Sequence, residues 1–269
     1  MSQSGTLRRK HQSLTEIKEI MESLKTMALI ETRKLTPVIA RQSALLDNIQ
    51  IASWNLRAHH PRLLLKSSTS ETSGLIAIGS ERGFCGDLNG VIDDVASAHT
   101  GPLLLIGTRL AERVEESVEG SRLAGLSVTE DIDPSVEHIL TEMADHEPMS
   151  WRVVYQDSSG VRDLPLEPPE PPDWYREPAY AMDLYLSPQA LWERLSQQHL
   201  VEALHLHTLN AFLFENQRRL QHLESAVQHL ETKLELLKKK QNRNRQEAIT
   251  QELEVLLLNA ERNKNSLRL

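Results

Sequence analysis

The feature that most constrains this chain is a stretch of about 50 residues, 209–258, which contains neither proline nor glycine. Its composition favours a helix throughout, and at about 1.5 Å per residue such a helix is about 75 Å long. That length exceeds the width of the globular domain that the remaining residues could build. We therefore expect a helix that projects from the domain and contacts other partners.

Apolar residues recur along this stretch at alternating spacings of three and four, which is the repeat of a coiled coil. A similar repeat spans residues 14–56, where Pro37 interrupts it and predicts a kink. Two such seams can pair with each other as antiparallel helices, or each can pair with another molecule. The predicted coiled-coil seam includes Leu14, Ile17, Met21, Leu24, Leu220, Leu223, Val227, Leu230, Leu234 and Leu237.

The C-terminal repeat is interrupted by ten consecutive polar residues, 238–247, and resumes out of phase at Ile249, Leu253 and Leu256. A helix that is polar on all sides needs ion pairs, solvent or a polar sleeve around it. The simpler interpretation is a solvated face. The alternative is a shaft whose polar collar touches other proteins, and the basic residues of that collar are Lys238, Lys239, Lys240 and Arg243.

Composition limits the class of protein. A hydrophobic content of 39% with only 4% aromatic residues is typical of a helix-rich chain. The single cysteine excludes an internal disulfide framework and fits a reducing compartment. No run approaches the roughly 20 apolar residues needed to cross a bilayer, and no apolar segment follows the basic N-terminus. We expect a cytosolic protein, or one peripheral to a membrane-bound assembly.

Charge is distributed unevenly, and it supports a division into three domains. Residues 1–66 hold 11 basic and 5 acidic residues, residues 67–187 hold 7 and 23, and residues 188–269 hold 12 and 10. We predict an N-terminal coiled-coil helix over 1–66, an α/β domain with an acidic proline-rich loop over 67–187, and a C-terminal coiled-coil helix over 188–269.

The central domain has the pattern of a small α/β layer. Continuous apolar runs at 74–79 and 103–107 end in glycine and are typical of buried parallel strands. We expect helices to follow them at 87–97 and 109–119, and a third strand at 151–155.

Three connecting segments are also predicted. Residues 67–73 are rich in serine and threonine and indicate a loop. Residues 163–178 contain six prolines and indicate an extended acidic loop or edge segment. The second long helix should begin with Ser187 as N-cap and Pro188 at its first position.

No catalytic constellation is evident. Gly79–Gly90 follows a strand, where phosphates are often held, but it lacks the spacing of dinucleotide-binding and P-loop motifs, so a structural turn fits better. Cys85 has no neighbouring base and is expected to be a small buried thiol. His205 and His207 lie on different helix faces, which argues against a metal site. The basic segment 238–245 lacks interleaved aromatic residues, so we expect no cofactor, no metal and no nucleic-acid partner.

Three motifs resemble the γ subunit of F-type ATP synthases. Arg245 with residues 246–253 (QEAITQEL) resembles the signature R-Q-A-x-I-T-x-E-[LI]. Residues 80–89 (SERGFCGDLN) resemble S-D-R-G-L-C-G-G-x-N, and residues 214–220 (FENQRRL) are similar to S-E-x-x-A-R-M. Residues 20–34 lie where the family's basic N-terminal helix belongs, and the resemblance covers the whole chain.

This resemblance implies an α/β fold with a long antiparallel coiled coil and a small Rossmann-like domain. It implies a central-stalk rotor that is not catalytic alone and that couples ion flow through the membrane ring to ATP synthesis or hydrolysis at the β-subunit sites. The implied partners are the α3β3 hexamer, the ε subunit and the c-ring, on the cytoplasmic side of the bacterial inner membrane. The implied contacts with the β-subunit catch loop are Arg245, Gln246, Thr250 and Glu252.

The sequence also departs from the family pattern. Glu31 stands where lysine is usual, Leu24 replaces methionine, Asp87 replaces glycine, and Pro37 is unexpected. With these departures the chain resembles a divergent branch of the family, such as the alternate, sodium-type F-ATPases. The coupling ion, H⁺ or Na⁺, and the net direction of the reaction stay open. The alternatives are a coiled-coil scaffold or adaptor that self-associates, and an enzyme with a dinucleotide site at Gly79–Gly90.

Overall fold

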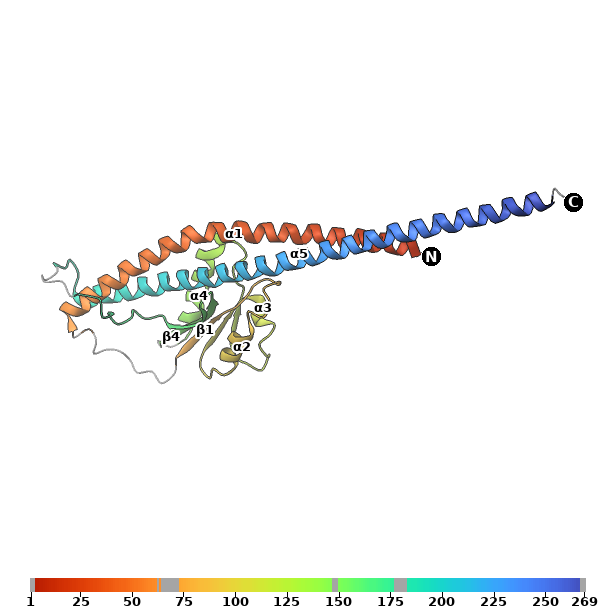
Figure 1. Ribbon diagram of the computed structural model, residues 1–269. Helices are drawn as coiled ribbons and strands as arrows, with labels where there is room; N and C mark the ends of the chain where they lie inside the picture. Colours follow the sequence, from red (N-terminus) through yellow and green to blue (C-terminus); the bar gives the residue numbers. More distant parts are fainter. Residues whose placement is uncertain (1–2, 62, 64–72, 147–149, 177–182, 267–269) are drawn as a thin grey trace. The chain divides into compact units, whose positions relative to one another are not determined.

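The computed structural model describes residues 3–61, 63, 73–146, 150–176 and 183–266, and their side chains between residues 5 and 257. Two long helices, α1 (Gln3–His59) and α5 (Pro188–Ser266), precede and follow a small sheet domain in the sequence (Figure 1). The predicted fold class is therefore confirmed. Residues 67–72 of the predicted serine- and threonine-rich loop lie outside the described residues.

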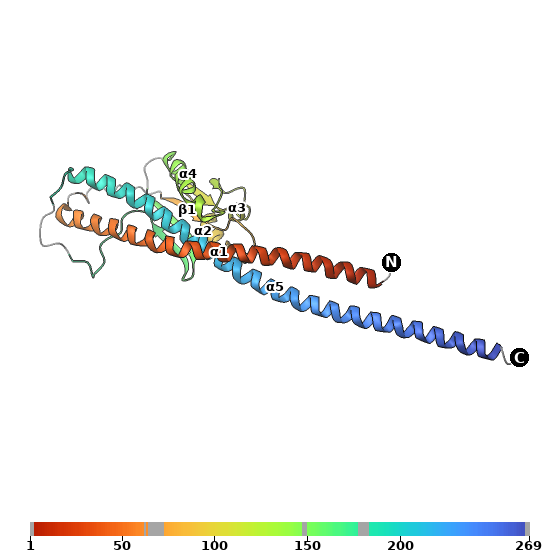
Figure 2. The same ribbon diagram turned by 90° about the horizontal axis from the view of Figure 1, so that it is seen from above.

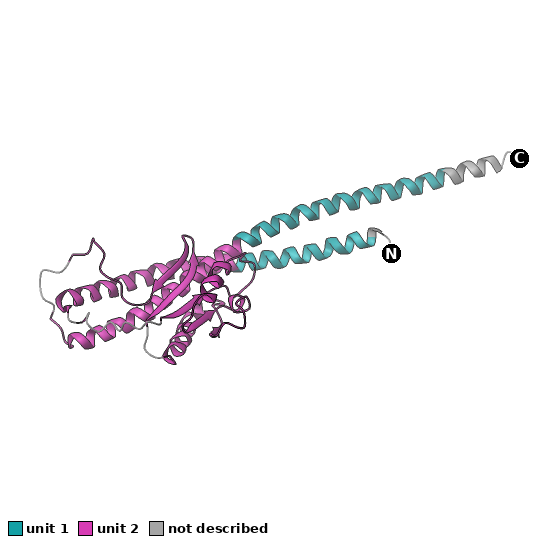
Figure 3. Cartoon of the chain, turned by 90° about the horizontal axis from the view of Figure 1, so that it is seen from below, with its two compact units in different colours: residues 1–27, 221–269 teal, residues 28–220 magenta. Residues whose placement is uncertain are grey.

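The chain forms two compact units (Figure 3). Residues 28–220 make up one unit, which contains the sheet, and residues 1–27 with 221–269 make up the other. Each long helix contributes residues to both units. The three charge-based domains, with limits at residues 66 and 187, remain a prediction.

The sheet in residues 28–220 has five strands in the order β3-β2-β1-β4-β5. β1 pairs in parallel with β2 and with β4, and β2 pairs in parallel with β3. β5 is antiparallel to β4 at the edge, so the start of the proline-rich segment is an edge strand, as predicted. The strands are β1 (Gly74–Ile78), β2 (Leu103–Ile106), β3 (Ser121–Leu123), β4 (Trp151–Asp157) and β5 (Gly160–Pro165).

Helices cover both faces of this sheet, which explains why its central strands are continuously apolar. One face carries Ile76 and Leu104 and packs against α4, α1 and α5. The other carries Leu75 and Leu105 and packs against α2 and α3 (Figure 1). The three shorter helices are α2 (Gly90–Ser97), α3 (Thr108–Ala111) and α4 (Ile132–Ala144).

The helix predicted over 109–119 is wrong in length, because α3 ends at Ala111. Glutamates at 112 and 116, and at 115 and 119, would stand four residues apart on one helix face, where like charges repel. The helix predicted from residue 87 starts later, at Gly90, with Asn89 as its N-cap residue. The Asn89 side chain bonds to Ser80 in the loop after β1, which fixes Asn89 to that loop.

Three elements were not predicted: β3, α4 and the short 3-10 helix at Thr129–Asp131 that precedes α4. β3 has three residues, too few for a recognisable alternation. α4 did leave a signal, because its apolar residues at 132, 136, 139, 140 and 143 follow the helical repeat. The predicted start of α5 is confirmed: the helix begins at Pro188, and Ser187 Oγ accepts a hydrogen bond from the Ala190 N–H at 3.3 Å.

The long helices are antiparallel within each unit (Figures 1 and 2). In the unit that contains both termini, Lys18 pairs with Glu231 at 2.8 Å, and Gln241 Nε2 donates to the Leu7 carbonyl at 3.1 Å. Among the predicted seam residues, Leu223, Val227 and Leu230 are buried and Ile17 is 42% exposed. The other six are partly buried.

Candidate functional site

The polar collar, residues 238–247, lies beside the first turns of α1, and the end of α5 follows it. Gln241 Nε2 donates a hydrogen bond to the Leu7 carbonyl of α1 at 3.1 Å. Beyond it, every side chain from Arg245 to Leu257 is exposed. The side chains of Lys238, Lys239 and Lys240 are exposed as well. Their exposure fits both a solvated face and a surface that touches other proteins.

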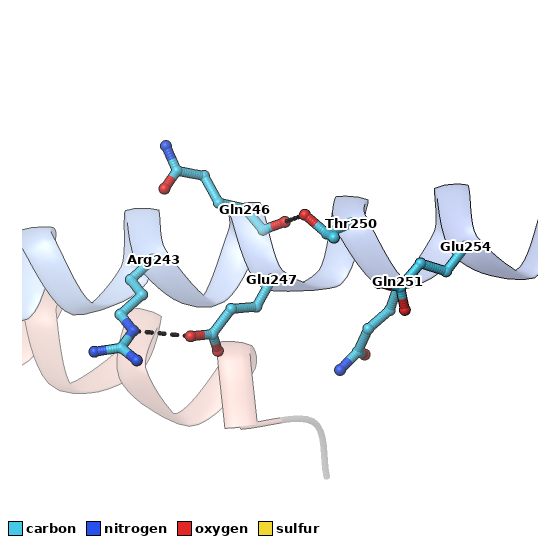
Figure 4. A pocket seen from close by; sticks show the side chains of 6 residues that line it. All are labelled: Arg243, Gln246, Glu247, Thr250, Gln251 and Glu254. Atoms are coloured by element: carbon cyan, nitrogen blue, oxygen red, sulfur yellow. Dashed lines mark hydrogen bonds and ion pairs between the residues drawn. The ribbon is translucent and has the colours of Figure 1, made fainter.

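A shallow polar hollow runs along one side of this segment (Figure 4). Arg243 Nε and Glu247 Oε1 form an ion pair at 2.8 Å, and Thr250 Oγ1 donates to the Gln246 carbonyl at 3.0 Å. Gln251 and Glu254 complete the lining. Both partners of the ion pair are largely exposed, so it adds little stability and leaves the side chains available to a partner.

The structure brings together only two of the four predicted catch-loop residues. Gln246 and Thr250 line the hollow. Arg245 and Glu252 are seven residues apart, which places them on one common face of an α-helix. That face is about 100° away from Gln246, because successive residues are rotated by that angle. The collar thus presents two separate polar faces.

Large apolar side chains alternate with polar ones on the segment after the collar, and they are exposed as well. Ile249 is 48% exposed, Leu253 55% and Leu256 63%. Apolar residues that gather on one exposed segment usually mark a contact with another molecule. We call the apolar residues of 249–257 the apolar tip; the side chain of Leu258 lies outside the described residues.

A second polar site joins the loop after β1 to α5, within residues 28–220. The Glu215 carboxylate accepts hydrogen bonds from the backbone N–H groups of Glu81 at 3.2 Å and Arg82 at 3.0 Å, and it pairs with Arg219. Arg219 Nε also donates to the Gly83 carbonyl at 3.2 Å. Glu215 and Arg219 are buried. Burial raises the pKa of Glu215, while Arg219 and the two N–H groups oppose that shift by stabilising the carboxylate.

This arrangement uses backbone N–H groups that a nucleotide site at this loop would need. In an open α/β sheet, phosphates bind to N–H groups beyond the carboxyl ends of the strands. Here the N–H groups of Glu81 and Arg82 already bond to Glu215. Cys85 is buried beside them, and burial raises the pKa of its thiol to about 12, so the thiol stays protonated and unreactive.

Sequence reasoning missed these contacts, although it had singled out both segments as motifs. Residues 80–89 and 214–220 are more than 100 residues apart, and nothing in either motif indicates that they touch. A carboxylate at 215 followed by arginine at 219 does indicate an ion pair across one helical turn. No group of three or more potential metal ligands occurs among the described residues, and none of the described helices has the length and hydropathy of a membrane span.

A family model described as ATP synthase matches residues 3–258. The chain belongs to the ATP synthase family, as an F1 γ-type subunit. No curated protein sequence matches it. The match does not favour a self-associating scaffold, and it confirms the resemblance that the three motifs indicated.

Solved structures of mitochondrial ATP synthases contain chains with a similar fold. A chain from the Euglena gracilis mitochondrial ATP synthase, OSCP/F1/c-ring, in rotational state 3 has a TM-score of 0.58 at 16% identity, with 94% of this chain and 92% of that chain covered. A chain from the rotor of the same organism's mitochondrial ATP synthase, in rotational state 1, has a TM-score of 0.55 at 16% identity. The match covers 91% of this chain and 98% of that chain. A chain from the central stalk and c-ring of the Tetrahymena thermophila mitochondrial ATP synthase has a TM-score of 0.53 at 14% identity. The match covers 77% of this chain and 99% of that chain.

Two departures from the γ family pattern have partners within residues 28–220. The Glu31 carboxylate accepts from the Thr129 N–H at 3.0 Å and from its hydroxyl at 2.7 Å. Asp87 pairs with Arg113 at 2.6 Å. Pro37 lies inside α1, which continues as a helix on both sides of it.

Proposed function

We propose that this γ-type chain is the rotor of an F-type ATP synthase, turning inside an α3β3 hexamer. In this role it couples ion flow through a c-ring to ATP synthesis or hydrolysis at the β-subunit sites. The observation that supports the proposal most directly is the end of α5, where an exposed polar collar is followed by exposed Ile249, Leu253 and Leu256. Such a helix needs a surrounding partner.

The two parts of this segment suit different contacts. Charged and amide side chains form directional hydrogen bonds that depend on the angle of the helix, so the collar suits contacts that are made at one rotor angle and broken at another. Apolar contact is not directional, so the tip suits a sleeve in which a shaft can turn. Each rotor angle would then favour one set of β-subunit conformations.

Further parts of the proposal concern partners and location. The chain is not catalytic by itself in this role, since the chemistry belongs to the β subunits. Its α/β domain contacts the ε subunit and the c-ring. It is peripheral to the membrane, on the cytoplasmic side of the bacterial inner membrane, within a divergent branch of F-ATPases. The acidic composition of residues 67–187 suits a contact surface unlike that of the shaft.

The collar contacts can be tested in the assembled enzyme. We expect the double substitution Arg245→Ala and Gln246→Ala to slow rotation-coupled ATP hydrolysis about tenfold, since losing a charge-assisted hydrogen bond costs about 1.5–3 kcal/mol. The chain itself should still fold, because both side chains are exposed. The measurements are steady-state ATP hydrolysis and far-ultraviolet circular dichroism.

Glu112→Gln is the matched control, because this exposed residue lies on the α/β domain and not on the shaft. Hydrolysis at the wild-type rate in the double variant would contradict the predicted catch-loop contacts.

A further inference from the structure

We propose that torque passes between the α/β domain and the two long helices through two polar joints, one on each helix. Glu31 on α1 and Glu215 on α5 are the positioning residues of these joints. The proposal rests on the rotor function and adds where the force enters the shaft. All residues of both joints lie within the unit formed by residues 28–220.

The α5 joint grips the loop after β1 at three successive residues. Glu215 accepts from the N–H groups of Glu81 and Arg82, and Arg219 donates to the Gly83 carbonyl. Glu215 is 3% exposed and Arg219 is 6% exposed. Hydrogen bonds to charged groups in such a buried site are strong and directional, so α5 cannot turn or slide against this loop without breaking them.

The α1 joint grips the segment that leads into α4. Besides its two bonds to Thr129, the Glu31 carboxylate pairs with Lys34, and Lys34 also pairs with Glu130, each at 3.1 Å. Burial opposes ionisation of Glu31, but the bonds from Thr129 and Lys34 outweigh it and lower its pKa. Glu31 is therefore charged at neutral pH and holds α1 to the α/β domain.

The Glu81 side chain links the two joints. Its carboxylate accepts from the Thr108 N–H at 2.9 Å, from the Thr108 hydroxyl at 2.8 Å and from the Gly125 N–H at 2.7 Å. Gly125 is followed by Leu126, which packs with Leu35 of α1 and with Leu209 and Phe212 of α5. The contacts thus run from α5 to the loop after β1, which contains Glu81, and from there to the loop after β3, which contains Gly125. Leu126 of the second loop then contacts both α1 and α5.

Both joints also lie at one level of the helix pair. Leu35 packs with Leu209 and Phe212, and the helices are antiparallel, so one turn beyond Leu35 on α1 corresponds to one turn beyond Phe212 on α5. Glu31 and Glu215 occupy these positions. They are close to the limits of the unit, at residues 28 and 220. The joints are therefore placed where a load on either helix reaches the α/β domain.

The test uses the enzyme assembled with its α3β3 hexamer and membrane ring. ATP hydrolysis depends on the shaft within the hexamer, whereas ion pumping also requires torque to reach the α/β domain. We expect Thr129→Val and Glu215→Gln to lower the number of ions pumped per ATP hydrolysed while hydrolysis continues. Valine keeps the size of threonine but cannot donate to Glu31 through a hydroxyl, and it leaves that carboxylate short of a partner.

Thr129→Ser, which keeps the hydroxyl, should pump nearly the wild-type number of ions per ATP, and Asp47→Asn, at an exposed position of α1 outside the acidic domain, should not change that number. If Glu215→Gln does not fold, Thr129→Val and Thr129→Ser decide the question, because valine keeps the shape of threonine without its hydroxyl, and serine keeps the hydroxyl while losing one methyl group. Wild-type pumping per ATP in Thr129→Val would overturn the joints. Failure of the wild-type chain to support hydrolysis with the hexamer would instead overturn the rotor function itself.

Discussion

At the scale of single residues, two residues that depart from the family motifs still make specific contacts in the fold. Glu31 replaces the usual lysine and finds Thr129 as its partner. Asp87 replaces a glycine and pairs with Arg113, which also reaches Asp93 at 3.2 Å. In each case the partner lies far along the chain, so the motif alone suggests a defect where the structure has a bond.

Buried histidines between α5 and the sheet make the fold sensitive to acid. His207 is 9% exposed, and its Nδ1 lies 3.2 Å from the Tyr155 hydroxyl. Burial lowers the pKa of His207 to about 4, with further contributions from His199 and Arg162. His199 is also buried, and burial lowers its pKa as well. Both side chains are therefore neutral in the folded chain at neutral pH.

We expect the free energy of unfolding to fall on acidification. Between pH 6.5 and about 4 the unfolded chain binds a proton at His207 that the folded chain does not bind, so stability is present above this window and is lost as the pH falls through it. The loss from pH 7 to pH 5 should be about 2 kcal/mol, measured by urea unfolding at both pH values. His207→Gln should show a smaller loss, and the exposed His222, changed in the same way, is the control; equal losses in all three proteins would contradict this origin.

At the scale of elements, α1 continues as one helix through a proline, and the predicted kink there stays a prediction. Pro37 lacks the N–H that would bond to the carbonyl of residue 33, yet α1 runs from Gln3 to His59 as one helix. The neighbouring Leu35 is fully buried and packs with Leu209 and Phe212. Packing on both sides of the proline therefore holds the helix together despite the missing bond.

Replacing this proline should stabilise the chain. Pro37 is exposed, so Pro37→Ala loses little packing and restores the missing N–H. We expect the free energy of unfolding to rise by about 1–3 kcal/mol, measured by urea unfolding. Ala40→Gly, an exposed substitution in the same helix, calibrates the assay with an expected fall of about 1 kcal/mol. A fall in stability for Pro37→Ala would show that α1 requires the proline geometry.

At the scale of the whole molecule, the long helices serve two different environments. Within residues 28–220 they pack on a sheet and are bonded to its loops. Within the other unit they contact each other, and the side chains of α5 from Arg245 to Leu257 are exposed. The same two elements thus contribute residues both to a folded domain and to a pair of exposed helices.

Hydrogen exchange should distinguish the free chain from the assembled one. A helix without packed neighbours opens easily, so amides 245–257 should exchange quickly in the isolated chain. Within an α3β3 hexamer they should be strongly protected, while Val153 and Val154 of β4, which are fully buried, should stay protected in both states. Equal exchange of 245–257 in the two states would contradict the proposed sleeve.

The sequence by itself determined those features that depend on neighbouring residues. The lack of proline and glycine made α5 a long helix, Ser187 and Pro188 marked its start, and continuous apolar runs identified β1 and β2. These signals are local, because caps and hydrophobic repeats act within a few residues. The short α3 and the unpredicted β3 mark the limit of this approach, since their bounds depend on where the chain must cross the sheet.

Only the tertiary structure decided which motifs meet. Glu215 lies more than 130 residues from the loop that it holds, and Glu31 lies 98 residues from Thr129. A hydrogen bond between such distant residues leaves no periodic pattern in the sequence, so neither joint could be predicted from the sequence. Burial created them: once α1 and α5 pack on the sheet, each carboxylate must find donors, and the loops beside it supply them.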